Sequence, residues 1–153
     1  QGIICFDDNN IRQLGVSDWV EIRKRSLSML FQDLRLFPEL TAVENVMLKS
    51  GLTGYADEKT VRRMLVRLGL EQHLDFACAT LSLGQQQRVA FVRALVQPCD
   101  FILLDEPVSH IDEACAREMA QMLRERQLRD NVGIIVTSIG YRLPYGYDRI
   151  VKL

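Results

Sequence analysis

This sequence lacks both a long apolar run and a marked excess of charge of either sign. No apolar stretch approaches the roughly 18 residues that a membrane-crossing helix needs, and the beginning shows no signal-peptide pattern. The 19 basic and 20 acidic side chains give a net charge of −1, so charge offers no argument for nucleic acid as a partner. Any membrane role would have to come through another protein.

Cysteine is too scattered in this sequence for a metal cage or a disulfide framework. The four cysteines are Cys5, Cys78, Cys99 and Cys115, and no C-x-x-C pair occurs among them. This pattern favours reduced thiols in the core of a cytosolic protein.

The composition is that of one globular domain. The 153 residues are 48% hydrophobic and 25% charged, a balance typical of a chain that buries about two thirds of its unfolded surface. Short strands are expected at Gly2–Asp7 and Ser28–Phe31, and a short helix over Asp18–Lys24 with Ser17 as its N-cap.

Helical patterns fill residues 33–96. Each of three expected helices opens on a capping signal, and the first should run through about Leu48. These signals are Thr41 with Glu44, Asp57, and Ser82 with Gln85. Three successive helices with strands on either side predict a helical subdomain inserted into an α/β core.

An apolar run at Phe101–Leu104 ends directly in Asp105 and Glu106. This pattern predicts a buried parallel strand that carries two acids to its carboxyl end. A second buried strand is expected at Ile134–Thr137 and a more exposed one at Arg149–Lys152. The alternation of strand, helix and strand predicts a parallel sheet.

The carboxyl end of such a strand is where open α/β sheets bind ligands. There Asp105 would hold Mg²⁺, and Glu106 would orient or deprotonate an attacking water. Two adjacent acids beside a buried run repel each other, and a metal ion bound to phosphates would neutralise them.

The helix that begins near Ser82 offers a second anion site through its free N–H groups and the positive end of its dipole. Ser82 and Gln85 would also serve simply as a helix cap. Gly84 costs the helix about 1 kcal/mol relative to alanine, and the close approach of a phosphate would explain why a glycine is there.

These segments together resemble the ATP-binding cassette (ABC) ATPases. The signature, Walker B and D-loop segments of that family are matched by Leu81-Ser82-Leu83-Gly84-Gln85, Phe101–Glu106 and Ser109-His110-Ile111-Asp112. The resemblance implies ATP and Mg²⁺ as cofactors. It also implies that a head-to-tail dimer sandwiches the nucleotide, with Ser82, Gly84, Gln85 and Asp112 on the nucleotide of the second subunit. Asp112 is equally explained as the N-cap of the next helix, and His110 as an exposed loop residue.

The stretch Leu30-Phe31-Gln32-Asp33-Leu34-Arg35-Leu36-Phe37-Pro38 resembles the Q-loop of the same family. The resemblance implies that Gln32 contacts Mg²⁺ and the attacking water, and that the loop after it contacts a membrane permease. Apolar Leu36 and Phe37 beside Pro38 suit a docking surface.

Two parts of the family pattern are missing from these residues. No G-x-x-x-x-G-K-[ST] motif occurs, so no phosphate-cradling loop is expected here. The simplest explanation is that the chain is the C-terminal part of a cassette. Ser138 stands where the resemblance implies a switch histidine, and serine cannot carry the positive charge. Slow ATP hydrolysis or a degenerate site would follow.

We therefore expect an α/β fold with an incomplete P-loop NTPase-like parallel core, formed by residues 1–32 and 97–153. Residues 33–96 would form the signature-bearing helical subdomain. The resemblance is strongest to ATP-binding subunits of the lipoprotein-release and macrolide-export type. It implies an ATPase on the cytoplasmic face of the membrane, bound to a permease, with Glu106, Gln32 and Ser138 at the catalytic site. The alternatives are a non-hydrolytic regulatory module and, more remotely, a soluble ABC ATPase of DNA repair or translation.

Overall fold

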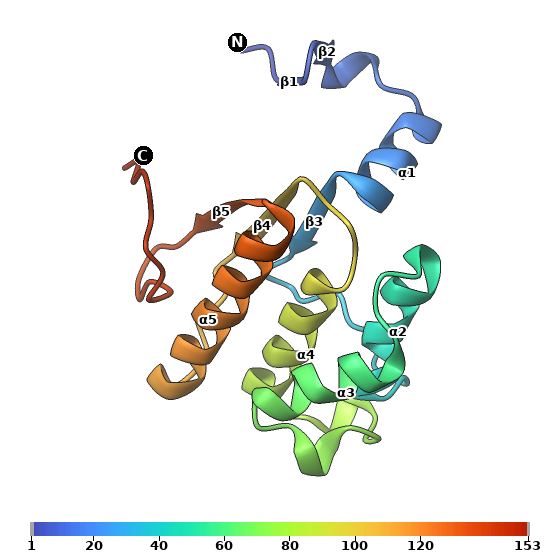
Figure 1. Ribbon diagram of the computed structural model, residues 1–153, viewed down its shortest axis with the longest axis vertical. Helices are drawn as coiled ribbons and strands as arrows, with labels where there is room; N and C mark the ends of the chain where they lie inside the picture. Colours follow the sequence, from blue (N-terminus) through green and yellow to red (C-terminus); the bar gives the residue numbers. More distant parts are fainter. Residues whose placement is uncertain (1, 153) are drawn as a thin grey trace.

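The computed structural model describes residues 2–152 and has a parallel sheet at its centre (Figure 1). Strands β3 (Leu27–Leu30), β4 (Phe101–Asp105) and β5 (Gly133–Thr137) lie in the order β3-β4-β5, and both neighbouring pairs are parallel. The predicted parallel sheet is confirmed. Because β4 is the central strand, its carboxyl end has a neighbouring strand end on each side.

Helices connect these strands. Helices α2 (Ala42–Thr53), α3 (Glu58–Arg67) and α4 (Leu83–Leu95) lie between β3 and β4 in the chain, and α5 (Glu113–Asp130) lies between β4 and β5. Short 3-10 turns occur at Ile11–Gln13, Glu71–His73 and Cys78–Thr80. The division of the chain into a core and a helical subdomain at residues 33–96 stays a prediction.

The capping signals predict where these helices begin. Thr41 and Glu44 form the expected capping box of α2, and Asp57 caps α3 by accepting a hydrogen bond from the Thr60 N–H. Helix α2 runs past the predicted end near Leu48 as far as Thr53, because nothing stops it before Gly54 adopts the left-handed conformation of a C-cap.

Helices cover only one face of the sheet in the part of the chain described. Ile102 and Leu104 on β4 are buried, as is Leu30 on β3, whereas Phe101 on β4 and Ile135 on β5 are about half exposed. The prediction that Phe101–Leu104 forms a buried strand is therefore confirmed for Ile102 and Leu104 and wrong for Phe101. Successive side chains of a strand point to opposite faces, and helices pack on only one of them.

The N-terminal segment extends away from the sheet (Figure 1). Its predicted strand is reduced to β1 (Cys5–Phe6), which pairs with β2 (Asn9–Asn10) in an antiparallel hairpin. Helix α1 (Val16–Arg25) begins earlier than predicted, and its N-cap is Gly15 rather than Ser17. The reason is that the Asp18 carboxylate accepts the Gly15 N–H at 2.8 Å and so fixes the helix start.

The predicted strand at Arg149–Lys152 is absent from the described residues, where this segment is irregular and exposed. A strand forms only where a neighbouring backbone completes its hydrogen bonds, and β5 pairs only with β4. In the chain after β5, Leu143 is buried, and Tyr145 packs against the core and donates a hydrogen bond to Gln127 of α5.

The prediction that all four cysteines lie in the core is also wrong. Cys78 is buried, Cys99 and Cys115 are half-buried, and Cys5 is exposed on the N-terminal hairpin. Burial raises the pKa of the three less exposed thiols. Among residues 2–152, no helix is both long enough and apolar enough to cross a membrane.

Candidate functional site

Strand β4 ends with Asp105, and the chain turns sharply at Glu106. Glu106 has a φ of 48°, in the left-handed region that non-glycine residues rarely adopt. This turn separates the two acids, which both line one open cleft of about 740 Å³ at the carboxyl end of the sheet. The predicted placement of both carboxylates at the rim of a parallel sheet is confirmed.

Each carboxylate has a hydrogen-bond donor from the end of β5. The Thr137 hydroxyl donates to Oδ1 of Asp105 at 2.5 Å, and the Ile139 N–H donates to Oε1 of Glu106. Both acids are half-buried rather than fully buried. The protein itself therefore stabilises both carboxylates in part.

Gln32 and Ser138 lie in the same cleft, although they are far from Asp105 and Glu106 in the sequence. Gln32 follows β3 and Ser138 follows β5, the two strands that flank β4. The hydroxyl of Ser138 donates to the Tyr141 carbonyl at 2.9 Å. Parallel pairing thus brings four predicted catalytic or metal-binding residues to one edge.

The oxygen ligands in this cleft fit a magnesium ion shared with a phosphate. Asp105 supplies a carboxylate and Gln32 an amide oxygen, which are ligand types that Mg²⁺ accepts. Within residues 2–152 no cluster of three or more His, Cys, Asp or Glu side chains could hold a metal ion.

Ser82, Gly84 and Gln85 lie at the start of α4 and do not line this cleft in the described chain. Ser82 and Gln85 form a reciprocal capping box: the Ser82 N–H donates to Oε1 of Gln85 at 2.8 Å, and the Gln85 N–H donates to the Ser82 hydroxyl at 3.3 Å. The cap is therefore present, and a role in binding nucleotide stays a prediction.

A close packing contact explains Gly84 without a phosphate. A Cβ at this position would lie 2.6 Å from the carbonyl oxygen of His110, in the loop before α5. That oxygen is backbone and cannot rotate away as a side chain can. The neighbouring loop is therefore enough to require glycine here, and the approach of a phosphate stays a prediction.

Gln87 joins α4 to this loop, and the sequence predictions missed it. Only 2% of this residue is exposed. Its amide nitrogen donates to the Glu106 carbonyl at 2.8 Å and to the Ser109 hydroxyl at 3.2 Å, and its amide oxygen accepts the His110 N–H at 3.1 Å. One signal in the sequence could have identified it. Gln87 is a polar residue four positions before the apolar Phe91, so both side chains lie on the same, inward face of the helix.

Asp112 ends the same loop and is the N-cap of α5, which was the structural role expected for it. Its carboxylate accepts the Cys115 N–H at 2.9 Å and so caps α5, and it lies 3.5 Å from the Arg88 guanidinium. The hydrogen bond from Cys115 and then the charge of Arg88 lower the pKa of the Asp112 carboxyl.

Arg93 on α4 holds the backbone of the loop after Gln32 and was also missed. Its guanidinium donates to the carbonyls of Leu34 and Arg35 at 2.6 and 2.7 Å. Both of these residues have positive φ, at 56° and 49°. Since left-handed backbone is costly for such residues, a fixed cation that satisfies both carbonyls stabilises the loop shape.

An apolar groove of about 390 Å³ lies beside this loop, between β3 and α2. Phe37 (54% exposed) and Leu52 (71% exposed) line it together with Leu48. Leu36, expected beside Phe37 on a docking surface, instead packs against the core. The exposed apolar side chains of the groove therefore come from three elements: Met29 from β3, Phe37 from the loop, and Leu48 and Leu52 from α2.

This arrangement of the cleft and loops can be compared with known proteins. The family model described as "ABC transporter" matches residues 1–109. The chain belongs to the ABC transporter family. Within that family, it is 33% identical over 155 residues to the lipoprotein-releasing system ATP-binding protein LolD of Legionella pneumophila (strain Lens), covering 99% of this chain and 68% of LolD.

A second relative is the macrolide export ATP-binding/permease protein MacB of Syntrophobacter fumaroxidans (strain DSM 10017 / MPOB). It is 32% identical over 153 residues, which are 97% of this chain and 21% of MacB. The chain spans about half the length, 47%, of several other curated relatives that it matches. These relatives confirm the predicted resemblance to the lipoprotein-release and macrolide-export type.

A solved ABC transporter cassette, MJ0796 in its dimeric form, has the same fold. The TM-score is 0.76 at 29% identity, and the match covers 90% of this chain and 62% of the cassette. The same cassette was also solved in a post-hydrolysis state bound to ADP and Pi. The expected fold class, an α/β P-loop NTPase-type core with a parallel sheet, is confirmed.

Proposed function

We propose that this chain is part of an ATP-hydrolysing subunit that drives an ABC transporter. The observation that carries the proposal is the convergence of Gln32, Asp105, Glu106 and Ser138 on one cleft at the carboxyl ends of β3, β4 and β5. Membership of the ABC transporter family supports it. ATP and Mg²⁺ are the proposed cofactors.

Each of the four residues is proposed to have one task in the cleft. Asp105 and Gln32 hold the magnesium ion, which neutralises charge on the phosphates. Glu106 orients or deprotonates the attacking water and is itself oriented by the Ile139 N–H. Ser138 has a single O–H, which donates to the Tyr141 carbonyl and would have to leave it to reach the terminal phosphate. It also carries no charge, so we expect turnover to be slow.

The phosphate cradle is proposed to come from outside these 153 residues, which contain no P-loop motif. The isolated chain should then bind ATP weakly, and calorimetry that gave micromolar affinity would contradict this. The start of α4, with Ser82, Gly84 and Gln85, and the loop at Asp112 are proposed to contact the nucleotide of a second subunit in a head-to-tail dimer. The dimeric MJ0796 cassette supports that arrangement.

The apolar groove lined by Phe37, Leu48 and Leu52 is proposed to receive a cytoplasmic segment of a membrane permease, which would hold the subunit at the membrane. Its exposed apolar side chains would lose contact with water on docking. Residues 33–96 are proposed to act as the helical subdomain that carries this groove's α2 wall together with the start of α4. Nucleic acid is not a proposed partner.

The test is the ATPase rate of the full-length protein with and without Glu106→Gln. We expect a slow, Mg²⁺-dependent rate that falls at least about a hundredfold in the variant, in the range usual for loss of a general base. Glu113→Gln, an exposed change at the start of α5, is the matched control and should leave the rate unchanged. A rate of zero before any substitution would favour the alternative, a non-hydrolytic regulatory module. The observation that favours this alternative is Ser138, at the position where the resemblance implies a histidine.

A further inference from the structure

Four buried side-chain atoms within residues 2–152 have no hydrogen-bond partner. They are Nδ1 of His73, Nε of Arg88, Oε1 of Gln97 and Nε of Arg126. Arginine stays protonated in proteins and glutamine does not titrate, whereas histidine changes its charge between about pH 5 and 8. His73 is therefore the member of this set whose hydrogen bonding can change with pH.

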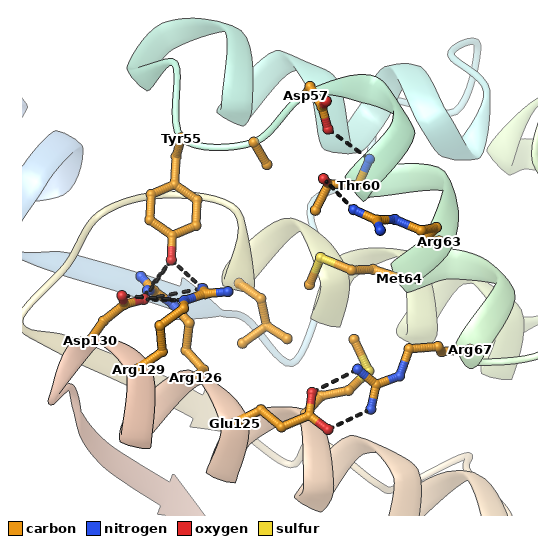
Figure 2. A pocket seen from close by; sticks show the side chains of 13 residues that line it. Tyr55, Asp57, Thr60, Arg63, Met64, Arg67, Glu125, Arg126, Arg129 and Asp130 are labelled. Atoms are coloured by element: carbon orange, nitrogen blue, oxygen red, sulfur yellow. Dashed lines mark hydrogen bonds and ion pairs between the residues drawn. The ribbon is translucent and has the colours of Figure 1, made fainter.

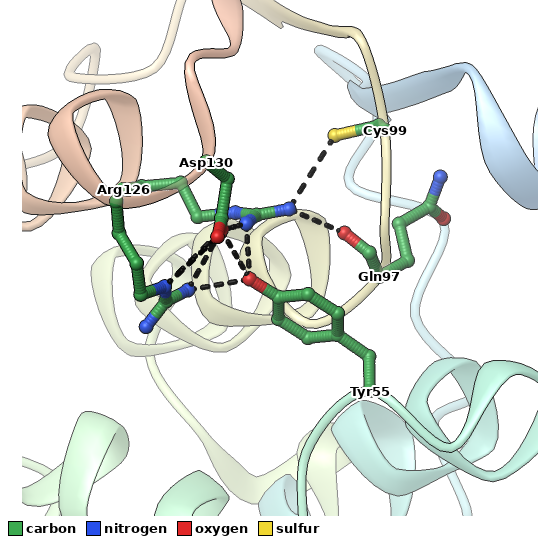
Figure 3. A network of polar contacts seen from close by, with 6 residues as sticks. Tyr55, Gln97, Cys99, Arg126 and Asp130 are labelled. Atoms are coloured by element: carbon green, nitrogen blue, oxygen red, sulfur yellow. Dashed lines mark hydrogen bonds and ion pairs between the residues drawn. The ribbon is translucent and has the colours of Figure 1, made fainter.

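The arginine-lined cleft between α3 and α5, of about 680 Å³, offers no comparable feature. Arg67 on one wall pairs with Glu125 on the other at 2.7 Å (Figure 2). Arg126 and Arg129 share the carboxylate of Asp130 at one end of the cleft (Figure 3). These charges are balanced within the protein, so they do not call for a ligand.

His73 lies in the 3-10 turn between α3 and α4, and its backbone is fixed on both sides. Its N–H donates to the carbonyl of buried Leu70 at 2.9 Å, and its carbonyl accepts the Phe76 N–H at 3.3 Å. The imidazole ring lies edge-on to the Phe76 ring, with 5.6 Å between the ring centres. These contacts hold the ring beside the Gln85 side chain at the start of α4.

The contact between His73 and Gln85 requires one tautomer of the imidazole ring. The side-chain oxygen of Gln85 accepts the Ser82 N–H at 2.8 Å as part of the cap of α4, so its NH₂ group is the end that faces His73. The nitrogen of that group lies 3.2 Å from Nε2 of the ring. A ring nitrogen that accepts a hydrogen bond carries no proton. The proton of the neutral ring is therefore on Nδ1, the buried atom without a partner in the described chain.

The charged side chains on this turn and on the helices around it have other partners or face water. They are the ion pairs Arg62–Asp75 and Arg88–Asp112, the capping residue Glu44 and the exposed Glu71. Within residues 2–152 none of them forms an ion pair with His73. A second proton on the ring would therefore remove the acceptor that Gln85 uses, and no carboxylate is paired with the ring to compensate.

We propose that His73 is a proton-sensitive support for the cap of α4. The neutral ring accepts a hydrogen bond from Gln85 and so holds the Gln85 oxygen in place for the Ser82 N–H. The protonated ring turns an N–H toward the NH₂ group of Gln85, and because two donors cannot bond each other, Gln85 moves and the cap opens. Acid would then weaken the contact of α4 with the nucleotide of a second subunit, a consequence that rests on the proposed function.

NMR on the full-length protein without nucleotide tests the cap directly. Exchange of the Ser82 N–H with water, relative to its intrinsic rate, should rise by about fivefold from about pH 8 to about pH 6, as for the loss of one helix cap. The Thr41 N–H is the matched internal control, because the Glu44 carboxylate accepts it at 2.8 Å in the same kind of capping box. The hydrogen bonds from Thr41 lower the pKa of the Glu44 carboxyl, so this second box should stay closed over the same pH range.

Two variants separate His73 from other titrating groups. His73→Phe keeps an aromatic ring beside Phe76 but cannot gain a proton, so the pH response of the Ser82 N–H should disappear. His110→Gln, in the loop that abuts Gly84, should leave the response in place. Circular dichroism would confirm that both variants are folded.

A further measurement needs no substitution, because the nitrogen shifts of the His73 ring report its tautomer. Near neutral or higher pH the proton should be on Nδ1, and the side-chain NH₂ signals of Gln85 should follow the titration of the ring. A proton on Nε2, equal changes at Ser82 and Thr41, or a response that persists in His73→Phe would each overturn the proposal. A protein that showed the Ser82 response but no ATP turnover at any pH would support the proton-sensitive cap and refute the proposed function instead.

Discussion

Substitution of Gly84 by alanine distinguishes two explanations for a glycine in the first turn of α4. If only a bound phosphate required glycine, the alanine variant would be more stable by about 0.5–1 kcal/mol without nucleotide, because alanine is the better helix former. The structure predicts the opposite sign. The new Cβ would lie 2.6 Å from the His110 carbonyl oxygen, and real Cβ atoms essentially never approach closer than 3.0 Å.

The size of this destabilisation depends on how far the loop at His110 can move away from the new Cβ. The loop cannot retreat freely, because the Gln87 side chain holds the His110 N–H at 3.1 Å and the Glu106 carbonyl at 2.8 Å. Overpacking of such a site costs about 1–3 kcal/mol. After the gain in helix propensity, Gly84→Ala should be less stable by about 0.5–2 kcal/mol.

The assay is urea unfolding followed by circular dichroism, without nucleotide. Gly51→Ala is the matched control, since Gly51 lies within α2 and a Cβ there meets nothing within 4 Å. The control should gain about 0.5–1 kcal/mol. If Gly84→Ala proved as stable as Gly51→Ala, the contact with His110 would not be what requires glycine, and the reasoning from packing would fail.

Three further outcomes are expected. Gln87→Ala should lower the free energy of unfolding by about 2–3 kcal/mol, because it leaves buried backbone groups of the loop without partners. Urea unfolding would measure this loss. A loss no larger than that of Gln121→Ala, an exposed change on α5, would contradict the prediction. The pKa of Asp112 is lowered in the folded chain, so its carboxylate stabilises the fold above its unfolded pKa of about 4 and this contribution is lost as the pH falls through the folded value. Asp112→Asn should therefore flatten the fall in stability below about pH 4, and parallel acid-unfolding curves would refute it. Iodoacetamide should label exposed Cys5 faster than buried Cys78, because burial raises the pKa of the Cys78 thiol. Peptide mass spectrometry would measure the two labelling rates, and equal rates would contradict the described burial of Cys78.

The predictions that succeeded rest on short-range chemistry. A capping box depends on a residue and one three positions later, so Thr41 with Glu44 and Ser82 with Gln85 could be recognised directly. The apolar run that ends in Asp105 and Glu106 likewise predicts, from residues adjacent in the chain, a strand with acids at its carboxyl end. The failure at Ser17 was also short-range, because Asp18 lies three positions after Gly15 and competed with Ser17 as the signal for the helix start. The failure at Arg149–Lys152 was not, because it depended on the lack of a paired strand among the described residues.

The sequence alone determined the family, the α/β class and the acids at the end of β4, because these depend on the order of residue types along the chain. Only the tertiary structure decided that Gln32 and Ser138 share a cleft with those acids, and that the His110 carbonyl abuts Gly84. These contacts join residues distant in sequence, and their distances are set by how the helices and strands pack.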